Sequence, residues 1–310
     1  ERTYEGNLSW VKDYEDFDDH KWTADFTFTR EREREQSTIL EDTLDRSGEL
    51  EQRVDNREKQ QRFFLQTDYV HPFSEDESFE VGTRATLRTI DTDFSLEDRL
   101  NDGSFREDPR FTNVFGFTEN VYAAYGIYNG AWGEDFTYQL GLRAESTEII
   151  TELDSIGENR RDFFNFFPST FLTYSLNSVS DIQVSYSRRI NRPGFWTLNP
   201  FFSFSDNRNF FSGNPDVNPE FTDSYEAGFL RYLEKGSVYG GVYYRHRTAV
   251  VERIRTVDST GFTRIFPVNL ATQDNWGIEL NMQWKPTDWY KVNANVNFYR
   301  SVTEGSYEGT

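Results

Sequence analysis

Apolar and polar side chains alternate with a period of two over several segments of this chain. In residues 136–145, the even positions hold Phe, Tyr, Leu, Leu and Ala, whereas the odd positions hold Thr, Gln, Gly, Arg and Glu. Residues 276–284 and 290–298 follow the same pattern, and the polar face of the latter segment carries three Asn. Because successive side chains of a β-strand point to opposite faces, the pattern predicts strands with one apolar and one polar face.

About twelve segments of the chain show this alternation, and no segment shows the period of an amphipathic helix. The sequence therefore predicts an all-β protein. The predicted strands are residues 4–10, 22–30, 63–69, 79–87, 121–127, 136–145, 166–175, 182–186, 225–229, 238–244, 276–284 and 290–298.

Composition excludes several classes of protein. The formal net charge of −20 argues against nucleic acid as a partner. Hydrophobic residues make up 36%, which is low for a domain with a large dry core. The 17% of Phe, Trp and Tyr is too high for a disordered acidic chain. The absence of Cys excludes disulfides and thiolate chemistry, and no apolar run reaches the length of a membrane helix.

Short connections between the predicted strands alternate with long ones. A compact soluble domain rarely repeats such long connections, whereas an outer-membrane barrel has short periplasmic turns and long extracellular loops. The pattern predicts an antiparallel transmembrane β-barrel segment of about twelve strands, with apolar faces toward lipid. A soluble sandwich or solenoid with these faces packed inward is the alternative. The short connections are 13–19, 71–77, 129–135, 177–180, 234–236 and 285–288, and the long ones are 32–58, 89–113, 147–162, 189–220 and 251–275.

One long connection carries a distinctive motif. Residues 188–193 read RRINRP, residues 213–220 read GNPDVNPE, and TDSYEAG follows at 222–228. Pro215 and Pro219 fix φ and remove two backbone donors, so the motif is expected to form a rigid extended hook leading into the next strand. The region, roughly residues 120–300, resembles the barrel of TonB-dependent receptors in the large outer-membrane β-barrel family of Gram-negative bacteria.

The resemblance implies partners and a larger parent structure. Outer-membrane lipid would surround the barrel, and a plug domain and the TonB energy-coupling complex would act with it. A surface lipoprotein is a further candidate partner. Residues 1–310 are expected to be part of one barrel domain, because plug and remaining strands are absent from the sequence and both ends fall on the long-loop side. The family implies a small-molecule, glycan or peptide ligand.

Two groups of residues are candidate ligand contacts. Polar residues on the inward phase include Arg143, Glu145, Arg189, Glu226 and Glu279, although ion-pair ladders that stiffen the wall explain the same residues. The long connection 189–220 also holds an aromatic group, and exposed aromatic clusters are typical of binding surfaces. Packing of this loop against the barrel mouth is its alternative explanation. The aromatic candidates are Trp196, Phe201 and Phe204.

No catalytic or metal-binding motif stands out. The sequence lacks a GxSxG elbow, a P-loop, an HExxH pair and a dinucleotide fingerprint, and its acidic runs lack calcium-loop spacing. We expect no enzyme activity, no cofactor and no metal. The leading hypothesis is an outer-membrane receptor for ligand uptake coupled to TonB. A non-transporting barrel or surface interaction module, and a soluble β-rich carbohydrate-binding protein, are the alternatives.

Overall fold

The computed structural model describes residues 1–42, 49–109, 111–153, 157–200, 202–206, 209–257, 261 and 263–307. These residues form one 15-stranded sheet with a single short helix, α1 (Phe195–Leu198). That helix is neither long nor apolar enough to cross a membrane.

Twelve of the strands are long, as the alternation predicts, and three are short. The long strands are β1 (Arg2–Asp13), β2 (Lys21–Asp42), β3 (Glu49–Pro72), β4 (Ser78–Arg99), β6 (Asn113–Trp132), β7 (Phe136–Leu153), β8 (Gly157–Asn177), β9 (Ser180–Asn191), β12 (Glu220–Leu233), β13 (Gly236–Val257), β14 (Thr263–Thr287) and β15 (Tyr290–Gly305). The short strands are β5 (Phe105–Glu107), β10 (Phe202–Asp206) and β11 (Asn209–Ser212).

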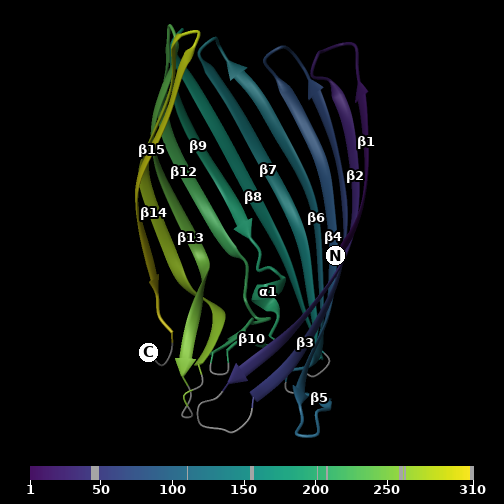
Figure 1. The fold of residues 1–310 in the computed structure, drawn as a ribbon. Coiled ribbons are helices and arrows are strands. Elements are labelled where there is room, and N and C mark those ends of the chain that lie inside the picture. Colours follow the sequence, from purple (N-terminus) through teal and green to yellow (C-terminus); the bar gives the residue numbers. More distant parts are fainter. Residues whose placement is uncertain are drawn as a thin grey trace.

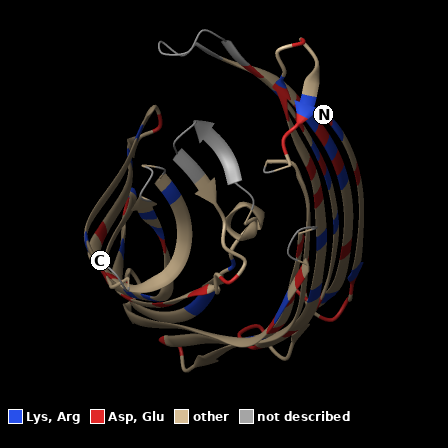
Figure 2. Cartoon of the chain, turned by 90° about the horizontal axis from the view of Figure 1, so that it is seen from below, with Lys and Arg blue, Asp and Glu red and all other residues tan. Residues whose placement is uncertain are grey.

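The long strands pair antiparallel with their neighbours and curve into an open wall. The order runs β1-β2-β3-β4-β6-β7-β8-β9-β12-β13-β14, with β15 paired to β14, so β1 and β15 lie at the two edges (Figure 1). Seen along the strands, the wall surrounds a space that contains α1 (Figure 2). This all-β wall confirms the predicted fold class.

The long connections are shorter in the structure than the sequence pattern predicts. Strands β2 and β3 pair continuously from Lys21↔Val70 to Asp42↔Glu49, which converts most of the predicted loop 32–58 into sheet. Alternation of hydrophobicity marks a strand only where one face is apolar, and these extensions are polar on both faces. Among the described residues, the connections between β4 and β6 and between β9 and β12 keep the most irregular structure.

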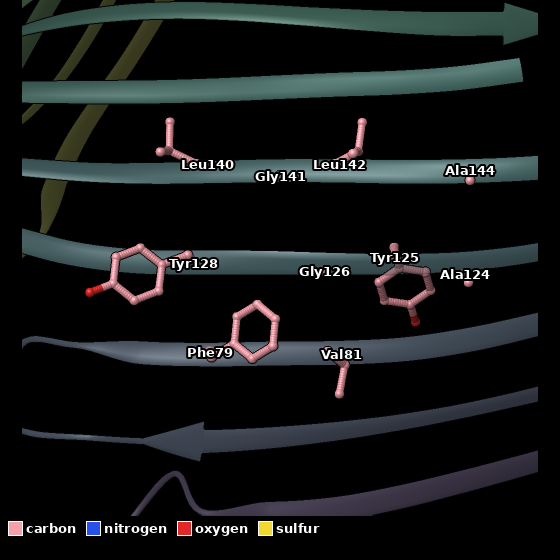
Figure 3. Close-up of a pocket in the computed structure, with 10 residues that line it drawn as sticks. All are labelled: Phe79, Val81, Ala124, Tyr125, Gly126, Tyr128, Leu140, Gly141, Leu142 and Ala144. Carbon is pink, nitrogen blue, oxygen red and sulfur yellow. The ribbon is translucent and has the colours of Figure 1, made fainter.

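A lipid-facing apolar band covers the convex face. Cross-strand partners share a face, and the registers align Val81, Gly126 and Leu142 across β4, β6 and β7. A shallow hollow of about 510 Å³ lies over this row between Phe79 and Leu140 (Figure 3). Since its lining is almost entirely apolar, acyl chains are its natural filling.

Aromatic rows border this band. Tyr186, Tyr225 and Tyr244 follow one another across β9, β12 and β13, with ring centroids 5.0 and 6.2 Å apart, and Trp276 continues the row on β14. Trp284 lies eight residues further along β14 on the same face, or about 20 Å in depth for a tilted strand. The two Trp residues therefore mark the two interfaces of the band.

On the side of the Tyr186–Trp276 row that faces away from Trp284, toward α1, the apolar residues lie on the opposite face of the strands. This end of the wall is called the upper end here and is drawn at the bottom of Figure 1. In β7, Leu140 and Leu142 lie on the convex face, whereas Ile149 and Leu153 are buried on the concave face. A core forms there against α1, which lies inside the wall (Figure 2) and contributes the buried Phe195 and Leu198. The buried members of the core are Ile90, Phe115, Phe117, Ile149, Leu153, Phe195, Leu198 and Val217.

Candidate functional site

The connection between β9 and β12 comprises residues 192–219 and is called the inner segment here. Its helix α1 lies on the concave side of the wall (Figure 2). It contains α1, whose four residues present Phe195 and Leu198 to the core. Phe195 lies 5.4 Å from Phe115 and 6.0 Å from Phe117, measured between ring centroids. The inner segment is therefore anchored to the wall by apolar contacts rather than extended into solvent.

The GNPDVNPE motif closes a slot in the wall. Strand β8 pairs with β9 only from Ser169 onward, and β12 pairs with β13 only as far as Thr248. Between the upper parts of β8 and β13, the described residues therefore form no strand ladder. The motif lies in this slot, with Val217 only 1% exposed.

Side chains from both sides of the slot hold the motif. Arg161 of β8 donates to the carbonyl oxygens of Val217 at 2.6 Å and Pro215 at 3.2 Å. From β14, Asn269 accepts the backbone N–H of Asn218 at 2.6 Å and donates to its carbonyl at 2.9 Å. The motif leads into β12 as predicted, but it is not extended throughout, because Pro215 and Asp216 form a turn in which the Val217 N–H donates to the Asn214 carbonyl at 3.3 Å. Val217 anchors the motif through its burial.

Gly213 begins the motif at a close approach between two parts of the inner segment. Its N–H donates to the carbonyl of Asn199 at 2.8 Å, and the next residue, Asn214, donates to Thr197 at 2.7 Å. A Cβ atom on Gly213 would lie 2.4 Å from the Asn199 oxygen and 2.7 Å from that of Thr197. Backbone atoms block the space, so no rotamer change relieves the clash.

We expect Gly213→Ala to destabilise the inner segment by roughly 1–3 kcal/mol, because two backbone hydrogen bonds must shift. Hydrogen exchange of the Thr197–Asn199 amides measures the change. Gly194→Ala is the control, since no atom lies within 4 Å of a Cβ there. Equal exchange in the two variants would contradict the close approach.

Two buried carboxylates hold the ends of the inner segment. At the entry, Glu145 of β7 is 6% exposed, accepts the Arg143 Nε–H at 2.5 Å and pairs with Arg192, which also donates to Thr147. We call Arg143, Glu145 and Arg192 the entry clamp. Buried charges of this kind are stable only when paired and hydrogen-bonded.

The exit from the inner segment has a matching arrangement. Glu220 accepts from Asn191 Nδ2 and from Arg247 at 2.7 Å each, and its other oxygen accepts the Val251 N–H at 2.7 Å. We call Asn191, Glu220 and Arg247 the exit clamp. The sequence-based choice of candidate sites did not include Arg192, Val217 or Glu220. The sequence did contain a signal for the two charged residues, because they stand at the two ends of the inner segment.

The remaining inward-phase candidates share the concave face but not a single cluster. Arg189 is exposed on β9 and makes no ion pair with any described side chain. Glu226 pairs with Arg245 at 3.1 Å, and Glu279 accepts from Asn281 at 2.5 Å. Arg143 and Glu145 meet directly, whereas Glu226 and Glu279 lie on β12 and β14 further along the wall.

Of the three aromatic candidates, the structure describes the side chain of Trp196 alone. Trp196 is 60% exposed on α1 and lies edge-on to Phe195 at 5.1 Å. Phe204 belongs to β10, opposite Phe210 of β11, but its side chain lies outside the described part. Phe201 lies outside the described residues altogether. An exposed indole on a firmly anchored helix is a suitable surface for stacking against a ligand.

In the part of the chain that the structure describes, no group of three or more His, Asp and Glu residues is arranged to hold a metal ion. The three His residues make other contacts. His20 Nδ1 lies 2.5 Å from Asp16 and its Nε2 lies 2.9 Å from the Tyr69 hydroxyl. His71 Nδ1 lies 3.4 Å from the same hydroxyl, and His246 Nδ1 lies 2.7 Å from Asp274.

Comparison with known proteins agrees with this architecture. The model of the "Outer membrane protein beta-barrel family" matches residues 15–310. No curated protein matches the chain. Among solved structures, the copper transporter OprC superposes with a TM-score of 0.67 at 15% identity, over 96% of this chain and 46% of that one.

Two further structures are similar in fold. The ferric yersiniabactin uptake receptor FyuA from Yersinia pestis gives a TM-score of 0.62 at 14% identity, over 97% of this chain and 43% of that one. The ferric citrate transporter FecA gives 0.63 at 12% identity, over 98% and 43%. The chain thus spans less than half the length of these structures, and at such identities the likeness is one of fold.

Proposed function

Because the chain belongs to the outer membrane protein beta-barrel family, we propose that it forms part of the wall of an outer-membrane receptor that takes up a ligand through its lumen. The observation that supports uptake most directly is the anchored inner segment, whose helix α1 lies inside the wall (Figure 2) and contains the exposed Trp196. Exposed Arg189 is the second candidate contact, because this cation forms no ion pair with a described side chain and can pair with an anionic ligand group.

Coupling to TonB through a plug domain is part of the same proposal. Fold similarity to uptake receptors and transporters supports it. The proposed role is transport without catalysis, with no cofactor and no resident metal. Arg143, Glu145 and Glu226 are engaged in ion pairs, which suits a structural role in the wall.

An uptake experiment tests the proposal in cells that carry the full-length gene. The probes are three defined mixtures: ⁵⁵Fe-loaded siderophores, oligosaccharides and short peptides. We expect one mixture to be depleted by wild-type cells and spared by a gene deletion and by a strain without TonB. Depletion that persists without TonB would support the non-transporting or passive barrel instead, and equal depletion in the gene deletion would refute uptake.

Trp196→Ala locates the contact within that experiment. Loss of one aromatic contact of about 0.5–1.5 kcal/mol should weaken uptake roughly 2- to 12-fold. Trp289→Ala is the matched control, because Trp289 is exposed in the short turn between β14 and β15, far along the wall from α1. Equal uptake by the two variants would remove Trp196 from the site.

A further inference from the structure

A run of alternating charges lies on β2 just beyond the lipid-facing band. Residues 30–35 read RERERE, so the arginines and glutamates occupy opposite faces of the strand. Phe26 and Phe28 precede the run on the arginine face, and their partners on β3 are Leu65 and Phe63. Leu65 and Phe63 are exposed, and the Phe63 ring packs against Phe28 with centroids 4.8 Å apart. The arginines therefore lie on the convex face, directly above the apolar band.

The strand registers bring four cations together there. Arg32 lies between Arg2 of β1 and Lys59 of β3, and Arg30 lies one step closer to the apolar band. We call Arg2, Arg30, Arg32 and Lys59 the basic patch. In a chain of net charge −20, four adjacent cations are a marked local excess.

Cations further out on the same strands are already neutralised. Arg34 donates to Asp55 through two nitrogens at 2.9 and 2.7 Å, and Arg57 donates to the same carboxylate at 2.8 Å. These contacts lower the pKa of Asp55 to about 2, so it stays ionised. The four residues of the basic patch, by contrast, form no ion pair with any described side chain, although Asp91 stands opposite Lys59 in the register.

Two other convex-face cations near this boundary have carboxylate partners, whereas Arg300 of β15, opposite Trp276, forms no ion pair with any described side chain but stands alone. Arg160 of β8 pairs with Glu148 of β7, and Arg188 of β9 lies 3.9 Å from Asp223 of β12. Among the cations described near this boundary, the basic patch is therefore distinct in bringing four without an ion pair together on neighbouring strands. Because the patch adjoins the apolar band, it is expected to face the headgroup region of the membrane.

We propose that the basic patch binds the phosphates of a lipid headgroup in the outer leaflet. Guanidinium groups match phosphate oxygens in pairs, and neighbouring cations on adjacent strands can hold a headgroup with two phosphates. The apolar face below, with Phe28, Phe63 and Leu65, receives the acyl chains of the same lipid. This inference rests on the membrane location of the wall and does not depend on ligand uptake.

Lipid titration of the full-length protein in neutral detergent, followed by native mass spectrometry, tests the proposal. The probe is diphosphorylated lipid A. We expect the double variant Arg30→Gln/Arg32→Gln to bind it at least tenfold more weakly than wild type. The control Arg160→Gln/Arg188→Gln removes the same charge from paired sites and should stay within twofold of wild type. Equal losses in the two double variants would overturn the proposal.

Two further measurements identify the source of the phosphate and guard against misfolding. Dephosphorylated lipid should bind wild type and Arg30→Gln/Arg32→Gln equally, and millimolar inorganic phosphate should not displace lipid A. Displacement by inorganic phosphate would indicate a free-anion site and refute lipid binding. Heat-modifiable migration on gels reports folding, and Lys59→Gln alone should weaken binding if the double variant fails that test. Unchanged binding by a folded Lys59→Gln would then count against the patch.

Discussion

Replacing Phe195 by alanine is expected to release the inner segment from the wall. Phe195 is 4% exposed and contacts Phe115 and Phe117 in the upper core. Removal of a buried phenyl ring typically costs about 3–5 kcal/mol. Since the wall is held by its own ladders, we expect most of this loss to appear as local opening of residues 192–219.

Residues 1–310 contain no Cys, so a single introduced thiol in this part of the chain provides a direct measurement. Ser212 is fully buried at the end of β11, so Ser212→Cys introduces a protected thiol with little change in size. Adding Phe195→Ala should raise the rate of maleimide labelling roughly 10²-fold or more, as about 3 kcal/mol implies. Adding Trp196→Ala should not, because Trp196 is exposed. Unchanged labelling in the Phe195 variant would mean that apolar packing does not hold the segment.

The second large effect concerns the face that meets lipid. Val184 lies midway along β9 on the convex face, close to Leu172 and Ala227. An arginine at this depth is expected to destabilise the folded barrel by about 2–4 kcal/mol, because its charge would face hydrocarbon. Chemical unfolding of the full-length protein in lipid bilayers measures the change.

Gln183→Arg is the matched control for Val184→Arg. Gln183 is the preceding residue on the same strand, opposite Gly228 of β12, and it faces the concave side. The two variants add the same charge at the same depth and differ only in face. Comparable destabilisation by both would contradict the assignment of faces and favour a soluble sheet with a buried convex side.

The strands within the membrane band could be predicted from the sequence, whereas those beyond it could not. Residues 276–284 alternate because lipid selects one face and the lumen the other, and β14 contains them as predicted. Residues 30–42 carry charges and polar groups on both faces, so hydrophobicity gave no sign that β2 continues to Asp42. Pairing with β3 alone decides that extension.

The candidate site was predictable in part for the same reason. The alternation in residues 136–145 correctly predicted that Arg143 and Glu145 share a face, because the face on which a strand residue lies depends only on its local position. Their meeting with Arg192 depends on how residues 192–219 fold back into the wall, which is a long-range property. Likewise, Pro215 and Pro219 predicted a rigid extended hook, but the turn at Pro215–Asp216 and the burial of Val217 in the slot between β8 and β13 depend on the fold around the motif.

The apolar residues of β7 lie on the convex face near Leu142 and on the concave face near Ile149. One strand is therefore stabilised by lipid in one part and by a protein core in the other. Below the upper aromatic row, stability should follow bilayer thickness and acyl-chain composition, since hydrocarbon contacts the convex side there. Above it, Ile149 and Leu153 belong to a water-excluding core, which should respond to urea and temperature as the core of an aqueous protein does. A thinner bilayer is therefore expected to weaken the lower half of the wall while leaving the upper half, and the segment docked on it, unchanged.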